Sequence, residues 1–157
     1  MQPTIIRRPA LLIAGLTGDG SQTGALWNEL DRKYGEKPFP KSDECGYEIR
    51  LYGGSQPIIP GRDIHAGFAA AGGGIGGFDA VALPEGDYAA FDVLVANGYD
   101  SGNAAMDKWL ADNAAVYGQR EVDGRLFVME CFNEKFKGGN QPDSVVEIWV
   151  PIYRKDK

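Results

Sequence analysis

Val145-Val146-Glu147-Ile148-Trp149-Val150-Pro151-Ile152-Tyr153 is the stretch that decides the fold of this 157-residue chain. Its side chains alternate with a period of two, which is typical of a β-strand. One face, at positions 146, 148, 150 and 152, is entirely β-branched and is expected to pack against a core. The other face carries Glu147, Trp149, Pro151 and Tyr153, residues that suit the wall of a half-buried hollow. The alternative is an amphipathic edge strand whose proline blunts the edge.

The composition indicates one acidic globular protein. The formal net charge is −6 and the sequence pI is about 4.8, so no basic patch is expected to bind nucleic acid. The chain contains no signal-peptide pattern and no apolar run long enough to span a bilayer, so we expect a cytoplasmic protein without a membrane partner. Cys45 and Cys131 form neither a disulfide framework nor a CxxC site; we expect reduced thiols, and a single long-range bridge is the alternative.

The periodicity changes in the same order twice along the chain. The expected elements are a strand at 10–16, a helix at 24–34, strands at 47–52 and 63–71, strand segments within 78–95, a helix at 105–117, and strands at 126–136 and 145–153. This order predicts an α+β fold of duplicated strand–helix–strand–strand units, about 9–72 and 78–153, within a single domain, 1–157. The antiparallel sheet would carry both helices on one face and leave a ligand cleft on the other.

Acidic and aromatic side chains on the strands are the candidate binding residues. Glu130 stands in the otherwise apolar strand 127–132, where a carboxylate must face solvent, pair with a cation or project into a cavity. If it is half-buried, it could hold a cationic ligand or act as an acid or base, and Glu147 is the second such acid. Aromatic side chains could stack on a planar cation. Those assigned to the ligand cleft are Tyr47, Phe68, Tyr88, Phe91, Phe132 and Trp149.

No cofactor or metal is expected from the motifs. The glycine run 72–77 contains G-x-G-x-x-G, but strand-like residues follow it, so no helix N-terminus is available for a dinucleotide phosphate. His65 is the only histidine, which excludes a histidine-rich metal site and makes a surface or core role the simpler interpretation.

Two strings are the most specific motifs: Leu83-Pro84-Glu85-Gly86-Asp87-Tyr88-Ala89-Ala90-Phe91 and Glu147-Ile148-Trp149-Val150-Pro151-Ile152. Together with the strand 11–16, the Leu26-Trp27 and Trp109-Leu110 pairs and the strand 127–132, they resemble the GyrI-like small-molecule-binding domain. This is the effector-binding domain of AraC-type and MerR-type multidrug regulators, which is also found alone. The resemblance extends over residues 9–153.

The resemblance implies two units in a pseudo-twofold arrangement with a cleft between them for lipophilic, often cationic aromatic compounds. A glutamate on a late strand would anchor the ligand, and Glu130 is the best match, followed by Glu147. We therefore expect a stand-alone protein that binds such compounds for drug or effector sensing or for sequestration; a homodimer or a protein partner stays open.

The resemblance also implies an alternative, a hydrolase of cyclopropane-bearing genotoxins that uses Glu130 and Tyr88. Tetrapyrrole binding, with His65 as the only imidazole ligand, and inhibition of a DNA enzyme are less favoured.

Overall fold

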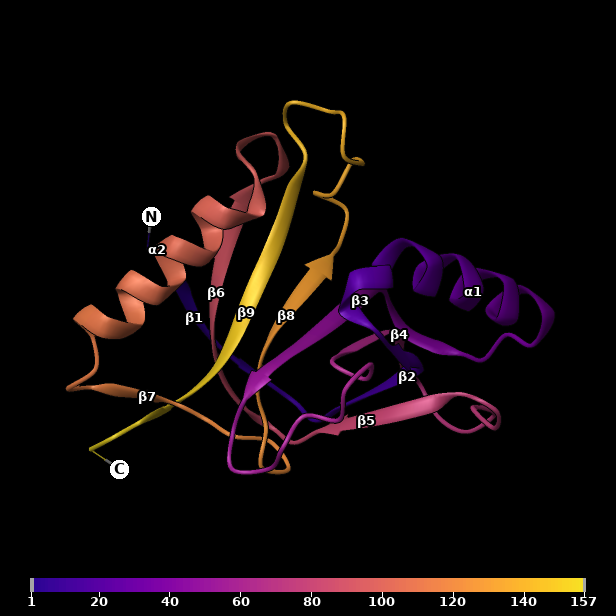
Figure 1. Cartoon of the computed structure of the whole chain (residues 1–157), viewed down its shortest axis with the longest axis horizontal. Helices are drawn as coiled ribbons and strands as arrows, with labels where there is room; N and C mark the ends of the chain where they lie inside the picture. The colour runs from indigo at the N-terminus through magenta and orange to yellow at the C-terminus, as the bar shows by residue number, and fades with distance from the viewer. Residues whose placement is uncertain (1, 157) are drawn as a thin grey trace.

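The computed structural model describes residues 2–156, and within this range β-strands form one nine-stranded antiparallel sheet on which two α-helices pack (Figure 1). The elements are β1 (Thr4–Arg8), β2 (Leu11–Gly18), η1 (Gly20–Gln22), α1 (Thr23–Glu36), β3 (Lys41–Gly53), β4 (Ile64–Ala70), β5 (Asp79–Leu83), β6 (Gly86–Leu94), η2 (Val95–Asn97), α2 (Tyr99–Asp112), β7 (Tyr117–Gln119), β8 (Leu126–Phe132) and β9 (Val145–Arg154). The predicted α+β class is confirmed. Neither of these α-helices is long and apolar enough to cross a membrane.

The strand order shows the duplication that the sequence predicts. The order is β1-β6-β9-β8-β3-β4-β2-β5, with β7 added beside β9. Outward from the central β8–β3 pair, β9 and β6 follow on one side and β4 and β2 on the other. Helix α1 lies between β2 and β3 in the chain, and α2 lies between β6 and β8. Each unit is therefore strand–helix–strand–strand, and the two units join along β3 and β8.

A second pairing between the two units curls the sheet. Strands β1 and β2 are consecutive, as are β5 and β6, and β1 pairs with β6 while β2 pairs with β5. Arg8 is paired with Gly86 before the bend, and Leu11 is paired with Leu83 after it. Both segments advance by three residues between these pairs, so the register is unchanged through the corner. Pro9 and Pro84 lie in this corner, where the ladder is interrupted and a missing N–H costs no strand hydrogen bond.

Strand β9 lies between β6 and β8, so both of its edges are paired, and most of its side chains on both faces are buried in the two cores. The alternative that it is an edge strand is therefore wrong. Its residues Val146, Ile148, Val150 and Ile152 pack beneath α2, on the side of the sheet that we call the helix face. Trp149 is only 5% exposed and belongs to the core enclosed by the curl, on the side that we call the inner face.

Substitution at Gly15 tests the close approach of β2 and β4. A Cβ at Gly15 would lie 1.8 Å from the backbone oxygen of Ala66, so the strands would have to separate. Gly15→Ala should lower the free energy of unfolding by about 1–3 kcal/mol, the usual cost of overpacking. Gly24→Ala is the control, because nothing lies within 4 Å of its Cβ in α1, and it should leave stability unchanged or raised. Equal urea midpoints for wild type and Gly15→Ala would contradict this packing.

Candidate functional site

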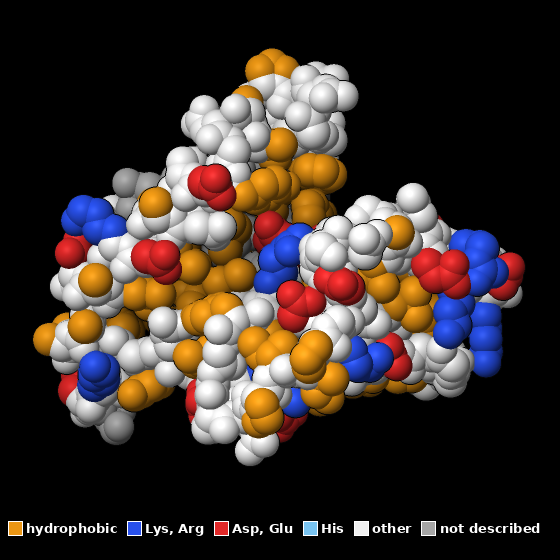
Figure 2. Space-filling model, viewed as in Figure 1, with side chains coloured by type: hydrophobic (Ala, Val, Ile, Leu, Met, Phe, Trp, Pro, Cys, Tyr) orange, Lys and Arg blue, Asp and Glu red, His pale blue; other side chains and the backbone are white. Residues whose placement is uncertain are grey.

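A cavity of about 390 Å³ opens on the helix face between the two units. Its lining residues are Thr23, Glu48, Arg50, Tyr99, Asn103, Val128, Glu130, Phe132 and Ile148. Figure 2 shows the hollow between the two helix-bearing lobes, with charged side chains among hydrophobic ones. The expected position, on the face without helices, is not where this cavity lies. Helix α1 packs mainly on β2 and β4 and α2 on β6 and β7, so the central strands β3 and β8 lie between the two helices.

Two buried carboxylates meet directly across the central strand pair. Glu48 of β3 is paired in register with Glu130 of β8, and their exposed fractions are 3% and 8%. Like charges at directly opposed strand positions repel, so the pair needs compensation. Arg50 supplies one positive charge, because its Nη2 lies 2.8 Å from Glu48 Oε2 and its Nε lies 3.4 Å from Glu130 Oε2. Trp27 also donates its indole N–H to Glu48 Oε1 at 2.8 Å.

The two acids differ in their affinity for a proton. Burial, the hydrogen bond with Glu48 and the negative charge of Glu48 raise the pKa of Glu130 to about 8, against the opposing effect of Arg50. Burial also acts to raise the pKa of Glu48, but hydrogen bonds from Glu130 and Trp27 and the charge of Arg50 outweigh it, so this pKa is lowered. The lowered pKa of Glu48 favours its carboxylate at neutral pH, and the raised pKa of Glu130 favours its protonated form. The cluster of Glu48, Arg50 and Glu130 is then electrically neutral.

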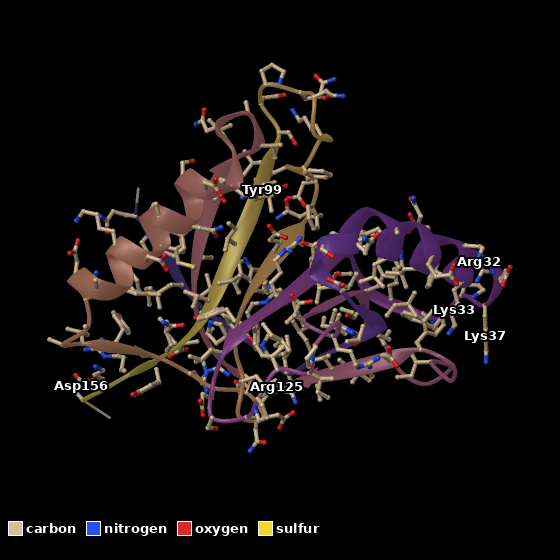
Figure 3. All side chains as sticks on the ribbon, in the orientation of Figure 1. Arg32, Lys33, Lys37, Tyr99, Arg125 and Asp156 are labelled. Carbon is tan, nitrogen blue, oxygen red and sulfur yellow. The ribbon has the colours of Figure 1, made fainter. Side chains whose placement is uncertain are left out.

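Aromatic side chains extend the cavity along α1. An adjoining hollow of about 380 Å³ shares Glu48 and Phe132 with it and is also lined by Trp27 and Phe136. The ring centroids of Trp27 and Phe132 are 6.0 Å apart, edge to face, and those of Phe132 and Phe136 are 4.9 Å apart. On the opposite side, Tyr99 lies at the start of α2 (Figure 3). A ligand here would meet aromatic rings as well as the acids.

The structure places only two of the predicted ligand residues, Glu130 and Phe132, in this cavity. Phe68 and Phe91 lie on the same face but are covered by the helices. Phe68 packs edge to face with Trp27 of α1, at 6.1 Å between ring centroids, and Phe91 packs in the same way with Trp109 of α2, also at 6.1 Å. These two phenylalanines hold the helices on the sheet.

The remaining predicted residues lie on the inner face. Trp149 packs against Tyr47 and Tyr88 at centroid distances of 6.3 and 5.6 Å. Glu147 accepts the Trp149 indole N–H at 3.0 Å and pairs with Lys135 at 3.0 Å. A ligand in the helix-face cavity would therefore not contact these four side chains. Tyr88 and Glu130, the pair expected for a hydrolase, project to opposite faces of the sheet.

Sequence reasoning missed Glu48, Arg50 and Tyr99. The signal for the first two was present, because the alternation in 47–52 puts Glu48 and Arg50 on one face of a strand. The pairing of that strand with 126–132 was not predicted, and this pairing brings Glu48 to Glu130. Tyr99 was outside the predicted helix, which was expected to begin at 105, whereas α2 begins at Tyr99.

Comparison with known proteins supports the fold. No protein-family model matches the sequence, and no curated protein matches it. The structure of SAV2435 bound to tetraphenylphosphonium is similar, with a TM-score of 0.66 and 13% sequence identity over 98% of this chain and 94% of that chain. The C-terminal domain of EcmrR has a TM-score of 0.64 and 12% identity over 97% of each chain.

EcmrR in a complex with DNA gives a TM-score of 0.64 at 11% identity, over 96% of this chain and 57% of that chain. At such identities the likeness establishes a shared fold, and this is the fold that the GyrI-like resemblance implies.

The raised pKa of Glu130 predicts a pH-dependent stability. An unfolded glutamate ionises near 4.5, whereas folded Glu130 ionises near 8, so folding takes up a proton between these values. The stabilisation of the folded state by this proton uptake is complete below about pH 4.5 and is lost as the pH rises through about 8. Glu130→Gln cannot ionise, so its melting temperature should exceed that of wild type by a margin that grows from about pH 5 to about pH 9.

Glu147→Gln is the control for this series and should behave oppositely. Burial acts to raise the pKa of Glu147, but hydrogen bonds from Trp149, Lys135 and Asn133 outweigh it and lower the pKa. Its stabilisation is present above the unfolded pKa and is lost as the pH falls, so the variant should be less stable than wild type at neutral pH. Parallel melting curves for both variants across the pH range would contradict the assignment.

Proposed function

We propose that the helix-face cavity binds lipophilic, cationic aromatic compounds and that the chain serves in drug or effector sensing or in sequestration. The observation that carries this proposal is the buried Glu48–Glu130 pair with a single arginine, beneath a wall of aromatic side chains. In the similar fold of SAV2435 the bound molecule is tetraphenylphosphonium, a cation surrounded by aromatic rings. The resemblance to GyrI-like domains points to the same class of ligand.

Binding would proceed by exchange of a proton for the ligand. Glu48 is already engaged by Arg50 and Trp27, so Glu130 is the acid that can become a new counter-charge. A cation placed near Glu130 favours the ionised form of this side chain. The cation then takes the place of the proton in compensating the charge of the two glutamates. Because the site is poorly solvated, the attraction between the ligand and the new carboxylate is weakly screened. The edges and faces of Trp27 and Phe132 would pack on the ligand's rings.

Titration with tetraphenylphosphonium tests the role of Glu130. Glu130→Gln keeps the shape but removes the charge and should weaken binding by about 1.5–3 kcal/mol, the range for hydrogen bonds to charged groups. The same substitution should weaken the binding of neutral triphenylphosphine oxide much less. Glu147→Gln, on the inner face, should bind both compounds as wild type does. Calorimetry measures all six combinations, and chromatography of the recovered ligand should show it unchanged, as expected for a binder and not for a hydrolase.

Equal losses for the charged and the neutral compound would remove the electrostatic role of Glu130. A loss confined to Glu147→Gln would assign the anchoring charge to the other acid.

The affinity for tetraphenylphosphonium should rise with pH and level off above about 8. Below the pKa of Glu130, the ligand must compete with the proton, so each pH unit should weaken binding by up to about tenfold. Titrations in buffers of different ionisation enthalpy should detect up to one proton released per ligand. Both effects should vanish in Glu130→Gln. An affinity that is the same for wild type at about pH 6 and about pH 9 would contradict proton exchange.

A further inference from the structure

A second cavity, of about 350 Å³, lies on the inner face of the same sheet. Its lining residues are Thr17, Ile49, Leu51, Ile59, Arg62, Ile64, His65, Ala80, Val81, Ala82, Val122, Asp123, Arg125 and Phe127. The alternation of β3 separates the two cavities, since Glu48 and Arg50 project to the helix face while Ile49 and Leu51 project here. Arg125 lies well apart from Tyr99 in Figure 3. The two cavities are therefore distinct sites on opposite faces.

Two arginines are among the polar groups of this cavity, whose lining is about equally polar and apolar. Within residues 2–156, the guanidinium groups of Arg62 and Arg125 take part in no ion pair. The Arg125 Nε is buried and, among the described residues, has no hydrogen-bond partner. A buried donor without an acceptor costs about 1–3 kcal/mol, and more when it carries charge. An acceptor supplied by a ligand would remove this cost.

The other polar groups of the cavity leave the arginines available. His65 donates from Nε2 to the backbone oxygen of Ile13 at 2.9 Å, and its Nδ1 accepts from the Thr17 hydroxyl at 2.8 Å. Burial of His65 lowers its pKa, which favours the neutral imidazole in which Nδ1 is the acceptor. Asp123 is the one carboxylate among the lining residues, so the two arginines leave an excess of positive charge.

A tight turn fixes the backbone that carries Arg125. Val122 and Arg125 bridge the two-residue turn of Asp123 and Gly124, whose φ angles are 51° and 75°. The Gly124 carbonyl accepts the Gln56 backbone N–H at 2.9 Å, which ties this turn to the loop that carries Ile59 and Arg62. The backbone that carries Arg125 is therefore in place before a ligand binds.

We propose that this inner-face cavity binds a small, largely apolar carboxylate. The carboxylate would accept hydrogen bonds from Arg125 and Arg62, since the planar guanidinium fork matches a carboxylate in geometry and charge. The body of the ligand would lie against Ile49, Val81 and Phe127. This site takes the opposite charge from the helix-face cavity and does not depend on the function proposed for that cavity.

Titration with a matched pair of compounds tests the proposal. 2-Naphthoate is the anionic probe, and 2-naphthylmethanol has nearly the same outline without the charge. Wild type should bind 2-naphthoate roughly tenfold or more tightly than the alcohol, as expected for a charge-assisted hydrogen bond. Arg125→Gln and Arg62→Gln should each reduce this preference severalfold. Arg32→Gln is the control, because it removes the same charge from the exposed face of α1.

Two further measurements separate the sites. Glu130→Gln should bind 2-naphthoate as wild type does, and saturating tetraphenylphosphonium should leave the 2-naphthoate affinity unchanged. Arg62 is exposed, so Arg62→Gln keeps the test informative if Arg125→Gln fails to fold. Absence of 2-naphthoate binding, equal affinity for the alcohol, or an equal loss in Arg32→Gln would each overturn the proposal. Displacement of 2-naphthoate by tetraphenylphosphonium would also overturn it, since the two would then share one site.

Discussion

The antiparallel pairing of residues 4–15 with 79–90 is the constraint on which the rest of the structure depends. It joins the two units at their outer strands, while β3 and β8 join them at the centre. With both junctions made, the sheet must curl, and the curl encloses the inner core around Tyr47, Tyr88 and Trp149. The same curl directs α1 and α2 away from each other. The opening over β3 and β8 is thus a result of how the units are joined.

The centre of the sheet combines a structural junction with an unfavourable charge pair. Strand pairing places Glu48 and Glu130 opposite each other, and neither can move away without breaking the ladder that holds the units together. One arginine faces two buried carboxylates, and burial together with the charge of Glu48 raises the pKa of Glu130. Such a buried cluster is weak evidence for stability and stronger evidence for a site. The uncovered strands and the aromatic wall around them fit that interpretation.

Periodicity predicted the faces of each strand but not what covers them. In 145–153 the alternation correctly separated Val146 from Trp149, yet both faces are buried, and Trp149 meets the inner core and not the cavity. Glu130 was found because an acid in an apolar strand is conspicuous, whereas Glu48 alternates with its neighbours in an ordinary way. Its importance comes from long-range strand pairing, which no local pattern contains. Helix α2 ends at Asp112, before the predicted 117, because Tyr117 pairs with Arg154 in the sheet.

A helix-face site without net charge, as the proposed function implies, bears on how the protein would discriminate between cations. A pocket with a permanent negative charge would attract potassium, magnesium and polyamines, which are abundant in cells and strongly hydrated. Under the proposed proton exchange, an incoming cation would have to displace the proton of Glu130 and give up its water, and a small inorganic ion would gain no apolar contact in return. A lipophilic cation has a diffuse charge, loses little hydration and buries its rings against Trp27 and Phe132. The stored proton would in this way exclude the common ions of the cell without any steric filter.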